Sequence, residues 1–299
     1  MELGASAVST SAFRLPTSEF APRGTFASLR RVKLIRHLTA TGPAYAALQP
    51  DGTAREILGD LLGYFRVGER TVTPGKLLAP IVPATIVCIG LNYAKHAAEG
   101  KRPPPDRPVW FMKLPGSIQN PGDPILLPAK QPTERADYEA ELAFVLRRTA
   151  RNVSRAAAPD YVLGYTCAND VSARDWQRDW GGSQWNHAKS FDTFCPLGPV
   201  LVTPDELPSP NALRIRSILN GTVMQDSTTA DMIFDVPTLL EFLSADKTLP
   251  AGTLILTGTP EGVGFARKPP VWLHPGDTIA VEIEQIGTLS NPVAAASGE

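Results

Sequence analysis

The sequence has few cysteines, and their spacing excludes the usual structural roles of that residue. Cys88, Cys167 and Cys195 are the three cysteines among 299 residues, and no two of them form a Cys-x-x-Cys pair. This excludes a disulfide scaffold and a zinc site built from thiolates, and it favours a reducing, cytoplasmic environment. Because each cysteine lies among apolar neighbours, we expect all three to fill the protein core.

The chain also lacks an excess of charge and a long hydrophobic run. Its formal net charge is −1 and its isoelectric point is near 6.5, so we expect neither nucleic acid nor an anionic membrane as a partner. The most apolar stretch, residues 81–91, is shorter than the roughly 18–20 residues that cross a bilayer, and it contains a proline.

Proline, by contrast, is abundant. The 29 prolines are roughly twice the usual share, and proline is excluded from helix interiors and central strands. We therefore expect short elements joined by shaped loops. Hydrophobic residues at 43% and charged residues at 20% are typical of a globular protein with one large domain or two.

The first 31 residues show neither a helical nor a strand period and are rich in small and hydroxyl side chains. We expect a poorly ordered arm here. A transit peptide is the alternative, because the segment has four arginines and only two acidic residues, although Pro16 and Pro22 interrupt any amphipathic helix.

Two further parts follow the arm. Residues 32–79 predict a small β-rich N-terminal domain, in which residues 32–36 and 44–48 pair across a Thr-Gly-Pro turn. Residues 80–299 predict a larger catalytic domain.

Most of the larger part predicts strands. Apolar or β-branched runs bounded by Gly, Pro or Asp occupy residues 85–89, 140–146, 161–167, 200–203, 253–256 and 278–283. Asn220-Gly221 predicts a two-residue hairpin. One helix is predicted from Pro237 through Leu243, with Asp235 as a capping residue. The pattern favours a β-dominated α+β fold over alternating strands and helices.

Three acids point to a metal site. Glu139 and Glu141 border a predicted strand, where residues two apart share a face, and Asp170 follows another apolar run. Such carboxylates repel one another unless a cation lies between them, and an all-oxygen site suits Mg²⁺, Mn²⁺ or Ca²⁺. The alternative is a solvated strand face. Glu282 and Glu284 have the same spacing and fit that interpretation.

His96 and Glu99 are three residues apart, so on a helical turn they would share a face and form a general base held by a carboxylate. A surface His–Glu pair at a short helix is the alternative. The proline-rich segment 100–108 suits a loop or lid. The glycines of segment 257–264 allow backbone to approach a ligand, but the segment lacks the Gly-Lys-Ser/Thr ending of a phosphate loop, which excludes nucleotide binding.

Five motifs, in their order along residues 80–285, closely resemble the fumarylacetoacetate hydrolase family. They are Gly-Leu-Asn-Tyr-x-x-His-x-x-Glu (90–99), Asp-Tyr-Glu-x-Glu-Leu (137–142), Asn-Asp-Val-Ser-Ala-Arg-Asp-x-Gln (169–177), Lys-Ser-Phe-Asp-Thr-Phe (189–194) and Thr-Gly-Thr-Pro-x-Gly-Val-Gly (257–264).

The resemblance implies the fold, the assembly and a set of functional residues. It implies a rolled β-structure beside the smaller N-terminal unit, and a homodimer. The metal ligands would be Glu139, Glu141 and Asp170, and the catalytic residues His96, Glu99 and Lys189. The family's substrate-contacting positions match Arg174, Gln177 and Thr259.

One difference from the family's motifs indicates which branch of the family the chain resembles. The members that cleave fumarylacetoacetate supply a further Asp to the metal from just before the histidine, whereas Gly90-Leu-Asn-Tyr93 offers no carboxylate. The chain looks closer to the acylpyruvate hydrolase, oxaloacetate decarboxylase and hydroxyheptadienedioate isomerase branch.

The expected function is a hydrolase dependent on Mg²⁺ or Mn²⁺, with Ca²⁺ as a further option, that cleaves a C–C bond in a 2-oxo or β-diketo acid. The cation would stabilise the enolate formed when the bond to C3 breaks, and His96 would activate water. Isomerisation or tautomerisation, and decarboxylation of oxaloacetate, are alternatives at the same site. An inactive metal-binding member of the family is a second alternative.

Overall fold

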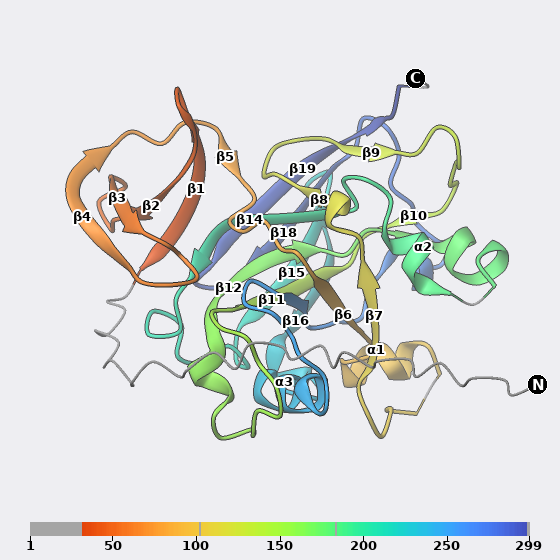
Figure 1. Cartoon of the computed structure of the whole chain (residues 1–299). Coiled ribbons are helices and arrows are strands. Elements are labelled where there is room, and N and C mark those ends of the chain that lie inside the picture. Colours follow the sequence, from red (N-terminus) through yellow and green to blue (C-terminus); the bar gives the residue numbers. More distant parts are fainter. Residues whose placement is uncertain (1–31, 102, 183, 298–299) are drawn as a thin grey trace, which may run out of the picture.

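The computed structural model describes residues 32–101, 103–182 and 184–297. The arm expected over residues 1–31 lies outside this part of the chain. Strands dominate and helices are few, so the predicted β-dominated α+β fold is confirmed (Figure 1). Among the described residues, no helix has the length and apolar character needed to span a bilayer.

The N-terminal unit is an antiparallel meander of four strands. They are β1 (Lys33–Thr39), β2 (Gly42–Leu48), β3 (Ala54–Gly59) and β4 (Phe65–Val72), followed by the short β5 (Leu77–Leu78). The turn between β1 and β2 falls at Ala40 and Thr41, one residue earlier than predicted, and Gly42 and Pro43 belong to β2. Pro43 is tolerated there because β3 pairs only with residues 46–48 of β2.

The same sheet continues into the body of the protein. After β1 its order is β14 (Cys195–Val202), β12 (Val162–Asn169), β11 (Ala140–Leu146), β17 (Leu254–Leu256), β6 (Ile86–Gly90) and β7 (Val109–Lys113). The link is short, with Lys33 opposite Val202 and Leu34 opposite Leu201. The boundary at residues 79 and 80 therefore divides one continuous sheet, and the division into two domains stays a prediction.

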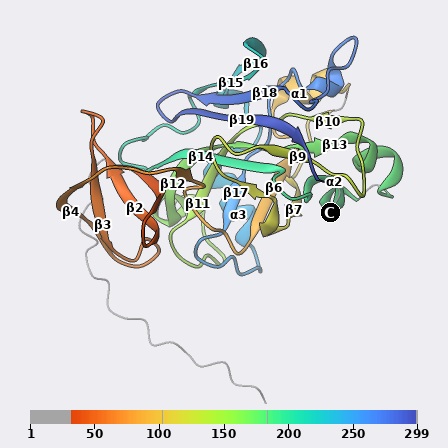
Figure 2. The same cartoon turned by 90° about the horizontal axis from the view of Figure 1, so that it is seen from above.

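A second sheet packs against this one. Its order is β16 (Thr222–Thr228), β15 (Arg214–Leu219), β18 (Thr278–Ile283), β19 (Gly287–Ala295) and β9 (Ile125–Leu127), as Figure 2 shows from above. Asn220 and Gly221, both with positive φ, form the predicted hairpin turn between β15 and β16.

Strand β11 lies between two hydrophobic cores and is buried along its whole length. Leu142 and Phe144 pack in one core with residues of β15 and β18, and Ala143 and Val145 pack in another with residues of β6 and β17. The second sheet covers one face of β11, and the other hydrophobic core covers the opposite face. A charged group at the end of β11 is therefore carried into the interior.

Several short elements complete the fold. They are β8 (Ile118–Gln119), the pair β10 (Ala136–Asp137) and β13 (Ser172–Ala173), the helices α1 (Ala94–Glu99), α2 (Trp185–Lys189) and α3 (Val236–Ser244), the π-helical turn η3 (Trp176–Trp180), and the 3₁₀ turns η1 (Pro115–Ser117), η2 (Ala158–Tyr161), η4 (Thr229–Asp231) and η5 (Gly264–Ala266). Asp235 caps α3 as predicted, because its carboxylate accepts from the Thr238 N–H at 3.0 Å.

The predicted strand at residues 200–203 begins five residues earlier, at Cys195. Pro196 and Pro199 argue against a strand over these residues, so the sequence did not predict this start. The structure accommodates them because the pairing of β14 with β12 is irregular between Tyr165 and Cys167, and Pro196 lies opposite Gln119 of β8.

Candidate metal centre and active site

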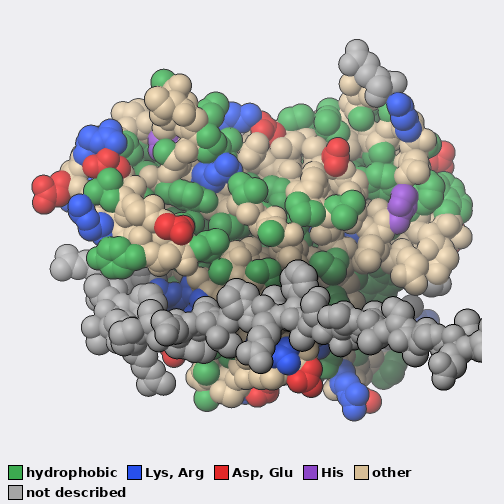
Figure 3. Space-filling model, in the orientation of Figure 1, with side chains coloured by type: hydrophobic (Ala, Val, Ile, Leu, Met, Phe, Trp, Pro, Cys, Tyr) green, Lys and Arg blue, Asp and Glu red, His purple; other side chains and the backbone are tan. Residues whose placement is uncertain are grey.

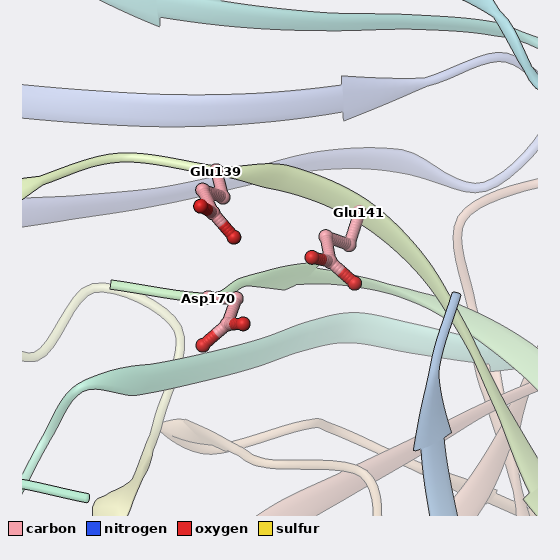
Figure 4. Close-up of side chains that lie close together, drawn as sticks. All are labelled: Glu139, Glu141 and Asp170. Atoms are coloured by element: carbon pink, nitrogen blue, oxygen red, sulfur yellow. The ribbon is translucent and has the colours of Figure 1, made fainter. Parts of the chain in front are cut away.

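Three carboxylates meet at one end of the antiparallel pair β11 and β12. Glu139 immediately precedes β11, Glu141 is its second residue, and Asp170 immediately follows β12. Because Ala140 pairs with Asn169, the register places Asp170 beside the start of β11. One oxygen of each carboxylate lies within 4.8 Å of the other two (Figure 4). Glu139 is 6% exposed, and the other two acids are fully buried.

Glu141 has little to balance its charge. Its Oε2 accepts from the Gly258 N–H at 2.7 Å, but its Oε1 has no hydrogen-bond partner among the described residues. Burial, together with the charges of Asp170 and Glu139, raises the pKa of Glu141 well above its ordinary value. A hard divalent cation would relieve both the repulsion and the missing partner. The donor set therefore fits Mg²⁺, Mn²⁺ or Ca²⁺, and it does not select among them.

Lys189, the last residue of α2, lies between two of the acids. Its Nζ is 2.8 Å from Oε2 of Glu139 and 2.8 Å from Oδ2 of Asp170. Burial by itself lowers the pKa of Lys189, but the charges of Asp170 and Glu139 raise it above its ordinary value, so the side chain stays a cation. Burial likewise raises the pKa of Glu139, but Lys189 and Arg174 outweigh it and lower that pKa to about 2.

A second buried lysine reaches one of these acids, Asp170, and the sequence pattern had not singled it out. Lys113 is the last residue of β7, and its Nζ donates to Oδ1 of Asp170 at 2.6 Å and to the Val171 carbonyl at 3.3 Å. One signal was available. Lys113 follows the buried Phe111 by two residues, so the alternation of the strand turns it inward as well.

Arg174 directs its three nitrogens to three different partners. Nε donates to Oδ2 of Asp137 at 2.8 Å, Nη2 to Oε1 of Glu139 at 2.6 Å, and Nη1 to Oε1 of Gln177 at 2.9 Å. Burial by itself lowers the pKa of Arg174, but the charges of Asp137 and Glu139 raise it. Asp137 was also missed in the sequence, although it precedes Glu139 by the same two residues that separate Glu139 from Glu141.

His96 and Glu99 lie on one face of α1. His96 Nδ1 is 3.1 Å from Oε2 of Glu99, and the two side chains are 19% and 26% exposed. The other oxygen of Glu99 accepts from the Gly262 N–H at 3.1 Å, which links the helix to the glycine-rich segment after β17. A surface His–Glu pair and a general base both have this spacing, but here the pair borders a cavity.

That cavity has a volume of about 950 Å³. Its lining includes His96, Glu99, Glu139, Arg174, Gln177, Lys189 and Thr259 together with apolar groups such as Phe111 and Trp185. Glu141 and Asp170 are not among the lining residues. They join the group because an oxygen of each lies within 4.8 Å of an oxygen of Glu139, which does line the cavity. The structure thus brings together all nine residues that the sequence proposed.

Glu282 and Glu284, the other pair with this spacing, belong to the outer side of strand β18 and its end. Glu282 lies opposite Arg216 of β15 and forms an ion pair with it. Glu284 is exposed and accepts from the Arg214 N–H at 3.1 Å. Neither residue lines the cavity.

Comparison with known proteins gives one family. The family model for the C-terminal domain of fumarylacetoacetate (FAA) hydrolase matches residues 85–294. The mitochondrial oxaloacetate tautomerase fahd2 of Xenopus laevis is 49% identical over 218 residues, which is 73% of this chain and 68% of that protein. The human mitochondrial oxaloacetate tautomerase FAHD2A is 44% identical over 217 residues, 72% of this chain and 68% of that protein.

Solved structures agree with this result. The 2-hydroxyhepta-2,4-diene-1,7-dioate isomerase of Mycobacterium marinum aligns with a TM-score of 0.76 at 41% identity, over 90% of this chain and 100% of that one. The fumarylacetoacetate hydrolase of Exiguobacterium antarcticum aligns with a TM-score of 0.80 at 36% identity, over 89% of this chain and 100% of that one.

Proposed function

The chain belongs to the fumarylacetoacetate hydrolase family, a family of enzymes, and we propose that it interconverts the keto and enol forms of a 2-oxo acid with the help of a divalent metal. The observation that carries the proposal is the buried group Glu139, Glu141 and Asp170, whose oxygens converge beside a cavity of about 950 Å³. Relatives named as a tautomerase and as an isomerase support this type of reaction.

Each residue has a distinct task in this proposal. The three acids would hold Mg²⁺ or Mn²⁺, which supplies a Lewis acid for the 2-oxo group. Lys189 adds a positive charge beside Glu139 and Asp170, where it stabilises the oxygen on which negative charge develops. Arg174, Gln177 and Thr259 line the cavity and bind the substrate.

His96 is the residue that transfers the substrate proton in this proposal. Its ring lies at the cavity wall and is oriented by Glu99 on the next turn of α1. A histidine held by a carboxylate takes the proton from C3 of the keto acid, and the protonated ring then gives that proton to the 2-oxo oxygen, which completes the enol. In the reverse direction the ring takes the proton from the enol oxygen and returns it to C3. Lys189 and His96 thus divide the work between charge stabilisation and proton transfer.

Hydrolysis of a C–C bond, which the sequence placed first, is the second candidate. The partial exposure of His96 and Glu99 favours it, because a water molecule can reach this pair from the solvent side. The same base would take a proton from water, and the hydroxide would attack the distal carbonyl of a β-diketo acid to give pyruvate and a carboxylic acid.

Parallel assays on the purified chain test whether keto–enol interconversion or C–C bond hydrolysis is the main reaction. With Mg²⁺ or Mn²⁺ we expect saturable loss of the enol absorbance of oxaloacetate, abolished by EDTA and restored by metal. Pyruvate release is measured from acylpyruvates and from oxaloacetate in the same samples. Faster release from acylpyruvates than enol conversion would place hydrolysis first, and no metal-dependent turnover of either acid would refute the proposal.

The relatives named above are mitochondrial by name, whereas the cysteine content favoured the cytoplasm. We propose that residues 1–31 decide the location, and fractionation of cells expressing the chain with and without them tests this. The homodimer implied by the family resemblance is tested by sedimentation of the purified chain.

A further inference from the structure

Asp137 is a buried acid that the reaction as proposed does not use. It is the last residue of β10 and is fully buried. Its carboxylate accepts four hydrogen bonds. Oδ1 accepts from the N–H groups of Tyr138 at 2.9 Å and Gly264 at 2.7 Å, and Oδ2 accepts from Arg174 Nε at 2.8 Å and the Phe265 N–H at 3.0 Å.

These bonds join two parts of the cavity. On one side, Arg174 is the residue that also contacts Glu139 and Gln177. On the other, Gly264 and Phe265 begin η5, and the segment 263–268, with the exception of Gly264, lines the cavity. We call residues 263–268 the wall segment. One carboxylate therefore holds both a neighbour of the metal ligands and a stretch of cavity wall.

The backbone brings these groups together. Asp137 lies opposite Ser172 in the β10–β13 pair, and the Arg174 N–H donates to the Arg135 carbonyl at 2.9 Å, so Arg174 runs alongside β10. Gly264 has no room for a side chain. A Cβ there would lie 1.9 Å from the Val271 carbonyl oxygen and 2.6 Å from Oδ1 of Asp137. The approach of the wall segment to Asp137 therefore requires glycine.

Charge balance alone does not explain this arrangement. Arg174 already has a carboxylate partner in Glu139, at 2.6 Å. A guanidinium presents its N–H groups in a rigid plane, so a third fixed partner at Nε sets the rotation of the whole group. Without Asp137, Arg174 could pivot about its contacts with Glu139 and Gln177, and two N–H groups of the wall segment would lose their acceptor.

We propose that Asp137 is a positioning residue, which fixes the orientation of Arg174 and the place of the wall segment so that both meet the substrate together. This inference rests on the proposed function of the cavity. It predicts that Asp137 acts mainly on substrate binding, because its partners lie at the substrate-contacting part of the site and not at His96, Glu99 or Lys189.

The test compares Asp137→Asn with Asp235→Asn in the full, Mg²⁺-loaded chain. Asp235 is the control, because its carboxylate also pairs with an arginine, Arg155, and accepts a helix N-terminal N–H, but it caps α3 and does not line the cavity. In Asp137→Asn an amide NH₂ replaces one acceptor oxygen. We expect hydrogen exchange at Gly264 and Phe265 to become at least about tenfold faster.

The kinetic readout separates positioning from a purely structural role. With oxaloacetate as the probe, we expect Asp137→Asn to raise KM at least about tenfold while kcat changes less than about threefold. Asp235→Asn should leave both values and the exchange rates unchanged. Unchanged KM in the folded Asp137→Asn protein, or unchanged exchange at Gly264 and Phe265, would overturn the proposal.

A second variant covers the case in which Asp137→Asn does not fold. Gly264→Ala displaces the wall segment but leaves the charges of Asp137 and Arg174 in place. KM should again rise with little change in kcat. An unaltered KM would contradict the proposal. If the wild-type chain turns over no 2-oxo acid, the proposed function fails. The exchange rates still decide whether Asp137 holds the wall segment.

Discussion

Two pairs of glutamates with identical spacing lie in opposite environments. Glu139 and Glu141 enter the interior at the start of β11, where Arg174 and Lys189, from other parts of the chain, form ion pairs with Glu139. Glu282 and Glu284 lie at the outer side of β18 and just after its end. Arg216 on the next strand balances the charge of Glu282, and solvent reaches the exposed Glu284. The spacing of two acids therefore says little about their role. What decides their role is whether both faces of the strand are covered.

The two pairs should also differ in how much the loss of a partner lowers the free energy of unfolding. An exposed ion pair contributes little, whereas a buried charge that loses its partner is costly. Substitutions at Lys189, Asp170, Glu141 and His96 should therefore change the free energy of unfolding by decreasing amounts.

Lys189→Met should have the largest effect. It removes the cation that bridges Glu139 and Asp170, so in EDTA the free energy of unfolding should fall by about 3–5 kcal/mol. Saturating Mg²⁺ should recover much of that loss, because the metal neutralises the same acids. Chemical denaturation measures both values. The control, Arg216→Met, removes the partner of Glu282 and should cost less than about 1 kcal/mol. Equal losses would abolish the contrast.

Asp170→Ala should remove the response to metal. In the wild-type chain, metal at 100 times its Kd should stabilise the fold by about 2.7 kcal/mol. The variant should show no shift of its melting midpoint with Mg²⁺ or Mn²⁺, and no turnover, because one of three ligands is gone. Glu284→Ala should keep the full shift. A response retained in Asp170→Ala would mean that the metal binds elsewhere.

Glu141→Gln should stabilise the metal-free protein, by about 1–3 kcal/mol at high pH. Burial and the charges of Asp170 and Glu139 raise the folded-state pKa of Glu141, so the ionised form is disfavoured in the fold. The folded wild-type chain binds this proton more tightly than the unfolded chain, and that stabilising term is lost as pH rises through the raised pKa.

The advantage of Glu141→Gln should therefore shrink as the pH falls, because the wild-type side chain becomes neutral as well. Melting curves in EDTA across a pH series measure this. The same change at the exposed Glu284 should have no such pH dependence. A variant that melts lower than the wild-type chain at every pH would contradict the account of an uncompensated charge.

His96→Asn should have the smallest effect on stability, within about 0.5 kcal/mol, because the side chain is partly exposed and Glu99 is its one side-chain partner among the described residues. Its effect on catalysis should be large, with kcat lower by about 100-fold or more. Melting and steady-state assays on one preparation separate the two. A stability loss as large as that of Lys189→Met would place His96 with the buried group instead.

Sequence patterns predicted much of this molecule where local features are sufficient. Residues 140–146 and 278–283 are strands with the predicted limits, since apolar and β-branched residues dominate both runs. The hairpin at Asn220 and the cap at Asp235 follow from single residues with strong preferences. The family's fold was predicted from the order of five motifs.

The partners of the acids were not predictable in this way. Lys113 and Lys189 approach Asp170 from two segments separated by more than seventy residues. Strand alternation could turn Lys113 inward, but no local pattern names the acid that it meets, because the packing of β7 and α2 sets that contact. Asp137 was overlooked for a related reason. Its alternation with Glu139 was visible, but its contacts with Arg174 and Gly264 arise only in the folded chain.

The short pairing of β1 with β14 has a consequence for anyone who redesigns this protein. Strands β3 and β4 are remote from the cavity, so their connecting loop is a suitable place to attach a tag or to graft another module. Deleting the whole N-terminal unit is a different matter. It would strip β1 from β14 and leave a naked strand edge, and such edges recruit other chains into aggregates. A shortened version should keep β1 or carry charged substitutions on that edge.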